Sequence, residues 1–223
     1  MVGYDWNFDV LTPFWGAFLR GTAVTIALSV GSFILGTIVG TACGAALRSV
    51  PGARVLFIIN DCVRAVPPLV LLFLVHYFPT SALFGLPPPS PFLSALLAFA
   101  IAQAAYTADI TRSAINQVPR SLLDGGLAIG LRHRDLWRYI VIPHAVRQML
   151  PAQIAFFIGI VRLSNLASVI GCQEVVFVGR VISAQAFRSL EPWILIAGIY
   201  IALIVPLTVL LREFEAKLMK APL

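Results

Sequence analysis

Charge-free apolar stretches alternate with short polar segments along the 223 residues of this chain. Residues 21–47 and 192–211 contain no charged side chain. At about 1.5 Å of rise per residue, either stretch forms a helix long enough to cross a hydrocarbon core of roughly 30 Å. Residues 55–78, 91–110 and 148–170 are also mostly apolar, with one or two charges each. The pattern predicts an all-α, polytopic membrane protein with five transmembrane helices.

The composition agrees with a membrane protein. Hydrophobic residues make up 59% of the chain, charged residues only 12%, and the mean hydropathy is +0.91. The net charge of +6 does not indicate nucleic-acid binding, because the basic residues do not gather with aromatic residues on a soluble segment. Cys43, Cys62 and Cys172 are widely spaced in apolar sequence, which favours small buried side chains over a disulfide or metal site.

The distribution of basic residues predicts the orientation. If the N-terminus lies outside, the outer loop at 79–91 has no basic residue, and the inner segments contain Arg48, Arg54, Arg112, Arg120, Arg132, Arg134, Arg138, Arg147, Arg212, Lys217 and Lys220. The positive-inside rule then places the N-terminus outside and the C-terminus inside. We expect an extracytoplasmic segment at 1–20, a transmembrane domain at 21–213 with a cytoplasmic loop at about 113–147, and a cytoplasmic tail at 214–223.

The N-terminal segment does not resemble a secretory signal. Asp5 and Asp9 stand where a signal peptide has a basic region, and no small-residue cleavage site follows. We therefore expect the first span to remain in the mature protein.

The cytoplasmic loop predicts two short helices. Ser121 and Asp124 form an approximate capping signal for the first, and Gly130 suits a left-handed C-terminal cap. Asp135 is expected to cap the second helix. Its apolar side chains, Leu136, Tyr139 and Ile140, are expected to face the bundle, while Arg134 and Arg138 face water or anionic lipid. On these residues alone, the loop is either a functional element or an amphipathic lipid anchor.

The loop resembles the EAA loop of ABC importer permeases, whose pattern is E-A-A, three residues, G, nine residues, I-x-L-P. The corresponding residues here, at the same spacing, are Asp124, Gly125, Gly126, Gly130, Ile140, Ile142 and Pro143. Aspartate replaces glutamate, two glycines replace two alanines, and isoleucine replaces leucine. Each glycine costs about 1 kcal/mol of helix stability relative to alanine, so this helix is expected to be looser or closer to its partner's backbone.

Three further stretches are similar to polar amino-acid permeases: VRAVPPLVLLF at 63–73, AYTADITRSAINQVP at 105–119 and VRLSNLASVIGCQEV at 161–175. They depart from that pattern by Asp109 for glutamate, Arg162 for lysine and Asn165 for serine. The resemblance covers residues 16–217. It implies the MetI-like transmembrane fold of type I ABC importers and uptake of polar amino acids, opines or related amines across the bacterial inner membrane.

The resemblance also implies partners: a second permease subunit, identical or homologous, two cytoplasmic ATPase subunits, a periplasmic binding protein and membrane lipid, but no nucleic acid. The chain contains no G-x-x-x-x-G-K-[ST] motif. We therefore expect no enzyme activity and no cofactor in this chain, with ATP and Mg²⁺ bound by the ATPase. By resemblance, coupling to the ATPase falls to Asp124, Gly125, Gly126, Gly130, Ile140 and Pro143.

Polar residues within or beside apolar spans are the candidates for the translocation path, because charges there usually face a cavity or a partner. The candidates are Asp61, Arg64, Pro67, Asp109, Arg162, Ser164 and Glu174. Asp61 with Arg64, and Asp109 with Arg112, have the i, i+3 spacing of an internal ion pair. Arg162 has no local partner, so a substrate carboxylate, unwound backbone and Glu174 all remain open. Pro67 and Pro68 suit either a path-lining helix or a simple kink.

Other features leave alternatives. Gly36, Gly40 and Gly44 allow close helix approach, and packing within the subunit is favoured over a dimer face. A secondary transporter or channel subunit driven by an ion gradient is the main rival function, but the chain shows no paired halves. An intramembrane enzyme is disfavoured because His76 and the other histidines stand apart from any nucleophile.

Overall fold

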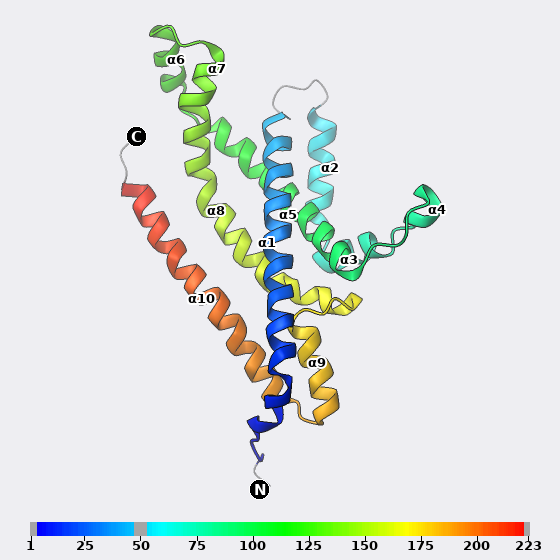
Figure 1. Ribbon diagram of the computed structural model, residues 1–223. Coiled ribbons are helices and arrows are strands. Elements are labelled where there is room, and N and C mark those ends of the chain that lie inside the picture. The colour runs from blue at the N-terminus through cyan, green and yellow to red at the C-terminus, as the bar shows by residue number, and fades with distance from the viewer. Residues whose placement is uncertain (1–3, 47–52, 221–223) are drawn as a thin grey trace.

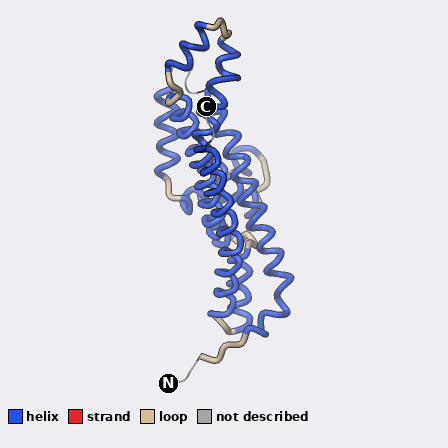
Figure 2. Tube along the Cα trace, turned by 90° about the vertical axis from the view of Figure 1, so that its left-hand side faces the viewer, coloured by secondary structure: helices blue, strands red, loops and turns tan. Residues whose placement is uncertain are grey.

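The computed structural model describes residues 4–46 and 53–220, and this part of the chain is helical with no strand. Figure 1 shows an elongated bundle with the central helix α1 (Trp15–Ala46) at its axis. A short 3-10 helix, η1 (Phe8–Phe14), precedes α1. The N-terminal end of the chain lies at one end of the bundle, and the C-terminal end of α10 (Leu190–Lys220) lies toward the other, as Figure 2 also shows.

Four segments of the described residues are long and apolar enough to cross a membrane. They contain α1, α5 (Pro91–Asn116), α8 (Ile142–Leu163) and the first part of α10. A bent pair, α2 (Ala53–Ala65) and α3 (Pro68–His76), makes a fifth span if the two halves count as one. The predicted fold class is confirmed, with the fifth span broken.

The break between α2 and α3 follows from two consecutive prolines. The helix axes differ by 103° across it, and Pro67 has extended-type dihedral angles, φ −56° and ψ 139°. Proline has no backbone N–H to donate, and its ring disfavours helical geometry in the residue before it. Hydropathy predicted one span at 55–78 and left open whether Pro67 and Pro68 kink it; the structure divides this span into two helices. A short helix, α4 (Thr80–Phe84), follows α3.

The most extensive packing joins α1 to α5, and glycine makes it possible. A Cβ added at Gly40 would lie 2.5 Å from the backbone oxygen of Ala104, and one at Gly36 2.7 Å from that of Ala100. Gly44 approaches the backbone of Ala108 in the same way. The glycine stripe therefore packs within the subunit, and the favoured alternative is confirmed.

The remaining elements complete the two ends of the bundle. The hairpin between α5 and α8 consists of α6 (Arg120–Ala128), α7 (His133–Leu136) and a π-helical turn, η2 (Trp137–Val141). After α8, a 3-10 helix, η3 (Ser164–Ile170), leads to α9 (Val175–Ala186), which packs on α1 and α10 around Phe18, Val175 and Ile182. Hydropathy did not predict α9, because a helix of 12 residues is too short to span a bilayer.

The cysteines differ in environment. Cys172 is buried as predicted, but Cys43 and Cys62 are exposed in the isolated chain, so their predicted burial is wrong. Both exposed cysteines lie on helices that also expose apolar side chains, among them Val39 of α1 and Ile59 of α2. An apolar exterior is expected there, because burial inside the subunit is not the only way a membrane protein covers apolar side chains.

Candidate functional site

The hairpin between α5 and α8 turns at Gly130, which has a positive φ of 80°. The backbone N–H of Gly130 donates to the Leu127 carbonyl at 2.9 Å, and that of Leu131 to the Gly126 carbonyl at 3.0 Å. This left-handed ending of α6 confirms the role predicted for Gly130. The turn directs α7 back along α6 and gives the hairpin a defined tip.

The two predicted N-terminal caps of the hairpin helices are wrong. Pro119, not Ser121, occupies the cap position of α6, and no side chain bonds to the free backbone N–H groups there. Arg132 occupies the cap position of α7, again without a side-chain bond, and Asp135 lies inside the first turn. Proline at the α6 boundary restricts the preceding backbone, and the helix starts two residues earlier than the capping signal predicted.

Gly125 and Gly126 have different surroundings. A Cβ added at Gly126 would lie 2.5 Å from Cδ2 of Leu136 and 2.9 Å from Cδ1 of Ile140. Nothing lies within 4 Å of a Cβ added at Gly125. Gly126 therefore allows α6 to lie directly on α7 and η2, while Gly125 is the residue open to an external surface.

Asp124 and Gly125 are exposed on α6, and three apolar side chains on α6 or directly after it are exposed as well. Leu122, Leu127 and Ile129 are 40%, 57% and 78% exposed. These apolar side chains are not covered by the described part of the chain, so they are available to a protein partner. These residues form what we call the hairpin face.

The second half of the hairpin leads into the membrane through η2. Ile140 packs against the cluster formed by Ala114, Val118 and Val141, and Pro143 follows in the first turn of α8. Proline cannot donate the helical bond expected of residue 143. Tyr139 is 62% exposed, so the prediction that it faces the bundle is wrong, whereas Leu136 is buried as predicted.

The charged residues of α2 and α5 meet across the two helices. Nη1 of Arg64 lies 3.1 Å from Oδ2 of Asp109 and 3.5 Å from Oδ1 of Asp61, and the guanidinium stands over the ring of Tyr106. Arg112 stacks on the ring of Phe57 at 3.7 Å. The predicted pair of Asp61 with Arg64 is present, but the predicted pair of Asp109 with Arg112 is wrong.

Three other path candidates lie between the end of α8 and the start of α9. Arg162, in the last turn of α8, is exposed, and no ion pair to it is found in the described part of the chain. Ser164 is buried and donates to the Val161 carbonyl at 2.8 Å. Glu174 is fully buried and caps α9, accepting from the backbone N–H groups of Val176 and Phe177.

Glu174 is thus occupied by α9 and is not the partner of Arg162. Its carboxylate also lies 3.5 Å from the hydroxyl of Thr25 in α1, which in turn accepts from the backbone N–H of Val175 at 3.2 Å. These bonds fasten α9 to α1. Of the path candidates, the structure brings together Asp61, Arg64 and Asp109 only.

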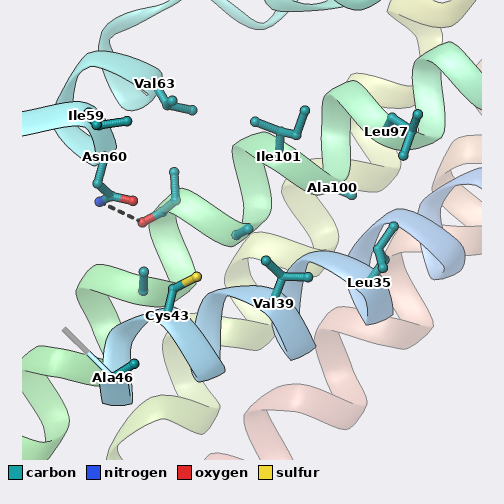
Figure 3. A pocket seen from close by; sticks show the side chains of 13 residues that line it. Leu35, Val39, Cys43, Ala46, Ile59, Asn60, Val63, Leu97, Ala100 and Ile101 are labelled. Carbon is teal, nitrogen blue, oxygen red and sulfur yellow. Dashed lines mark hydrogen bonds between the residues drawn. The ribbon is translucent and has the colours of Figure 1, made fainter. Parts of the chain in front are cut away.

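An apolar pocket of about 540 Å³ opens between α1, α2 and α5. Figure 3 shows its lining, which includes Leu35, Val39 and Ile101. The side-chain amide of Asn60 is directed to the backbone oxygen of Ala105, at 3.1 Å. A lining of this kind offers little to a polar solute, so this pocket is not the candidate path.

The path candidates predicted from the sequence do not include a buried polar cluster between α5 and α8. Gln103, Thr107 and Gln153 are each at most 5% exposed. The available signal was the i, i+4 spacing of Gln103 and Thr107 on one helix face inside an apolar span.

Comparison with known proteins identifies the family to which this chain belongs. The sequence profile of the family described as "Binding-protein-dependent transport system inner membrane component" matches residues 32–220. The chain belongs to this family. The family resemblance predicted from the hairpin sequence is confirmed, and the chain is a membrane permease component of a binding-protein-dependent transport system.

Several relatives of this permease component match over most of its length. The glutamine transport system permease protein GlnP of Escherichia coli (strain K12) is 29% identical over 96% of this chain and 98% of its own. The probable amino-acid ABC transporter permease protein PatM of Vibrio harveyi is 33% identical over 71% of each chain. The octopine transport system permease protein OccM of Rhizobium radiobacter is 31% identical over 84% of this chain and 80% of its own.

Solved structures agree with the sequence relatives. A chain of a crystal structure of an amino acid ABC transporter with histidines superposes with a TM-score of 0.85 at 27% identity, covering 96% of this permease component and 100% of that chain. An inward-facing MetNI methionine ABC transporter chain superposes with a TM-score of 0.78 over 93% and 98%. At 17% identity, the second match shows the shared fold alone.

Proposed function

We propose that this permease component forms the translocation pathway of an ABC importer for polar amino acids or related compounds in the bacterial inner membrane. Relatives named as glutamine, arginine and octopine transport system permeases support this substrate class. The single observation that carries the proposal is the cytoplasmic hairpin, which keeps the EAA spacing and presents an uncovered hairpin face.

We assign the hairpin as the coupling element. The α6 segment docks on a cytoplasmic ATPase through the hairpin face, with Gly125 allowing close approach and Asp124 offering a carboxylate. Gly126, Gly130, Ile140 and Pro143 then shape the hairpin and its connection to α8, while Gly126 itself stays inside. A complete transporter contains a second permease subunit, two ATPases that bind ATP and Mg²⁺, and a periplasmic binding protein.

For the path, we propose two polar stations. One is the Arg64 cluster with Asp61 and Asp109, beside the break at Pro67. The other is Arg162, whose exposed guanidinium at the end of α8 requires a counter-charge inside a membrane. A carboxylate, common to all amino acids, is a bidentate partner for arginine.

The orientation is proposed with the N-terminus outside. The hairpin face and the basic residues beside it then lie in the cytoplasm, where the ATPase is. Labelling of single cysteines near Pro88 and near Arg132 with a membrane-impermeant maleimide tests this. We expect outside labelling at the first position only; the reverse pattern would invert the topology.

Reconstitution tests the transport function. The permease is reconstituted in proteoliposomes with its cognate ATPase and binding protein, and uptake of radiolabelled glutamine, arginine, histidine and octopine is measured. We expect uptake of one or more of these to require ATP and both partners, and to survive ionophores. Uptake that disappears with the ion gradient and needs no ATPase supports the secondary-transporter alternative instead.

A further inference from the structure

Three buried polar side chains meet between α5 and α8, near the middle of both helices. Gln103 and Thr107 of α5 are 2% and 0% exposed, and Gln153 of α8 is 5% exposed. Buried amides and hydroxyls require hydrogen-bond partners, and the requirement is stricter where lipid surrounds the bundle. We call these three residues the α5–α8 polar cluster.

The members of the cluster satisfy one another. Nε2 of Gln103 donates to Oε1 of Gln153 at 3.0 Å and to Oγ1 of Thr107 at 3.1 Å. Nε2 of Gln153 donates to the same hydroxyl at 3.1 Å, and the hydroxyl donates back to Oε1 of Gln153 at 3.3 Å. The Thr107 hydroxyl therefore uses both lone pairs and its proton within the cluster.

Helix α1 covers the cluster through its glycine stripe. A Cβ added at Gly36 would lie 2.6 Å from Cβ of Gln103, and one at Gly40 would lie 2.6 Å from Cβ of Thr107. Any larger residue would hold α1 away from the cluster. The close approach excludes lipid and water, so the amides have few competing partners and the bonds are strongly directional.

A second contact between the same helices lies nearer the hairpin and differs in kind. There, Ala114, Ile115 and Val118 of the α5 end pack on Val141, Ala145 and Met149. Apolar contacts are not directional, so they allow one helix to roll on the other. The hydrogen bonds of the cluster, in contrast, exist at only one rotation of α5 relative to α8.

We propose that Gln103, Thr107 and Gln153 are positioning residues that lock the rotation of α5 relative to α8, so that both helices follow the hairpin as one body. Because α5 and α8 are the two helices that the hairpin connects, rolling between them would absorb its movement. This inference rests on the proposed function, in which the ATPase moves the hairpin.

Substitutions at Thr107 separate hydrogen bonding from packing. Thr107→Val keeps the shape and removes the hydroxyl, whereas Thr107→Ser keeps the hydroxyl and removes a methyl group. The double variant Gln103→Met/Gln153→Met removes both amides at similar volume, which preserves the fold better than leaving one amide unpaired. Gln148→Met is the matched control, because Gln148 is an exposed residue of α8 outside the cluster.

The measurement is the number of ATP molecules hydrolysed per solute imported by the complete reconstituted transporter, using the amino acid selected by the uptake panel. We expect Thr107→Val and the double variant to raise this ratio by between about twofold and thirtyfold, the range typical of residues that carry coupling. Thr107→Ser and Gln148→Met should keep the wild-type ratio. A purely structural role would change the yield of assembled transporter but not the ratio.

Two outcomes overturn the inference, and they differ from failure of the proposed function. A wild-type ratio in both Thr107→Val and the double variant shows that the cluster does not position the helices. A raised ratio in Thr107→Ser with a normal ratio in Thr107→Val assigns the effect to packing. Absence of ATP-driven uptake by the wild-type transporter would instead reject the proposed function and this inference together.

Discussion

The two adjacent glycines of α6 provide a direct test of the coupling assignment. We compare Gly125→Leu with Gly126→Leu, which make the same chemical change at neighbouring positions of one helix. The structure predicts different consequences, because a side chain at Gly125 meets open space and one at Gly126 meets Leu136 and Ile140. Gly125→Leu should block docking from outside, and Gly126→Leu should disturb the hairpin from inside.

The expected magnitudes follow from the contacts. At Gly126, the Cβ alone lies 2.5 Å from Cδ2 of Leu136, so this atom must retreat by about 1 Å to reach ordinary van der Waals separation. Overpacking of this kind costs about 1–3 kcal/mol, against nearly 1 kcal/mol gained by replacing a helical glycine. At Gly125 only the gain applies. Gly125→Leu should therefore leave the hairpin intact or stabilise it.

Two measurements separate the variants. Hydrogen exchange of the backbone amides at 120–141, on the permease without ATPase, should be faster in Gly126→Leu and unchanged or slower in Gly125→Leu. Co-purification of the ATPase with the permease should then be lost in Gly125→Leu despite its ordered hairpin. Normal ATPase assembly and uptake by Gly125→Leu would refute the assignment of the hairpin face as the docking surface.

Three further predictions concern the bundle. Gly40→Ala should lower the thermal unfolding temperature of the purified permease, because its Cβ would lie 2.5 Å from a backbone oxygen of α5, whereas Gly198→Ala, with nothing within 4 Å, should not. Arg162→Ala should reduce uptake without loss of the ATPase; unchanged uptake would remove Arg162 from the path. Tyr4→Phe should destabilise the contact between the N-terminal segment and α10, because the phenol donates to the buried Glu191 carboxylate at 2.6 Å. This bond raises the pKa of Tyr4 above its ordinary value of about 10. The stabilisation that the bond provides is therefore complete below the ordinary pKa and is lost as the pH rises through the raised pKa. In this pH range, the unfolding temperature of the wild type should fall more than that of Tyr4→Phe.

The sequence predicted the class of fold because membranes impose a simple rule. A segment crosses the hydrocarbon core only if it is long, apolar and able to satisfy its own backbone, and hydropathy reports the first two conditions. The hairpin was also predictable, since its glycine and proline positions depend on local backbone geometry. Gly130 has the positive φ that its place in the sequence suggested.

The partners of individual side chains were not predictable in the same way. Spacing along one helix paired Asp109 with Arg112, but the approach of α2 brings Arg64 to Asp109 and leaves Arg112 on Phe57. Glu174 was a candidate for the translocation path and for an ion pair with Arg162. In the structure it is the N-terminal cap of α9, a helix that hydropathy did not predict. Ion pairs and caps depend on which helices meet, and local spacing contains no such information.

The sequence by itself determined that this is a polytopic permease with a hairpin that turns at Gly130, because span length and turn residues act within a few residues of one another. Only the tertiary structure decided that Gly126 faces inward and Gly125 outward, and that two glutamines 50 residues apart share a threonine hydroxyl. Both depend on the rotation of one helix against another. That rotation is set by the summed packing of whole helix faces, which no single segment of the sequence specifies.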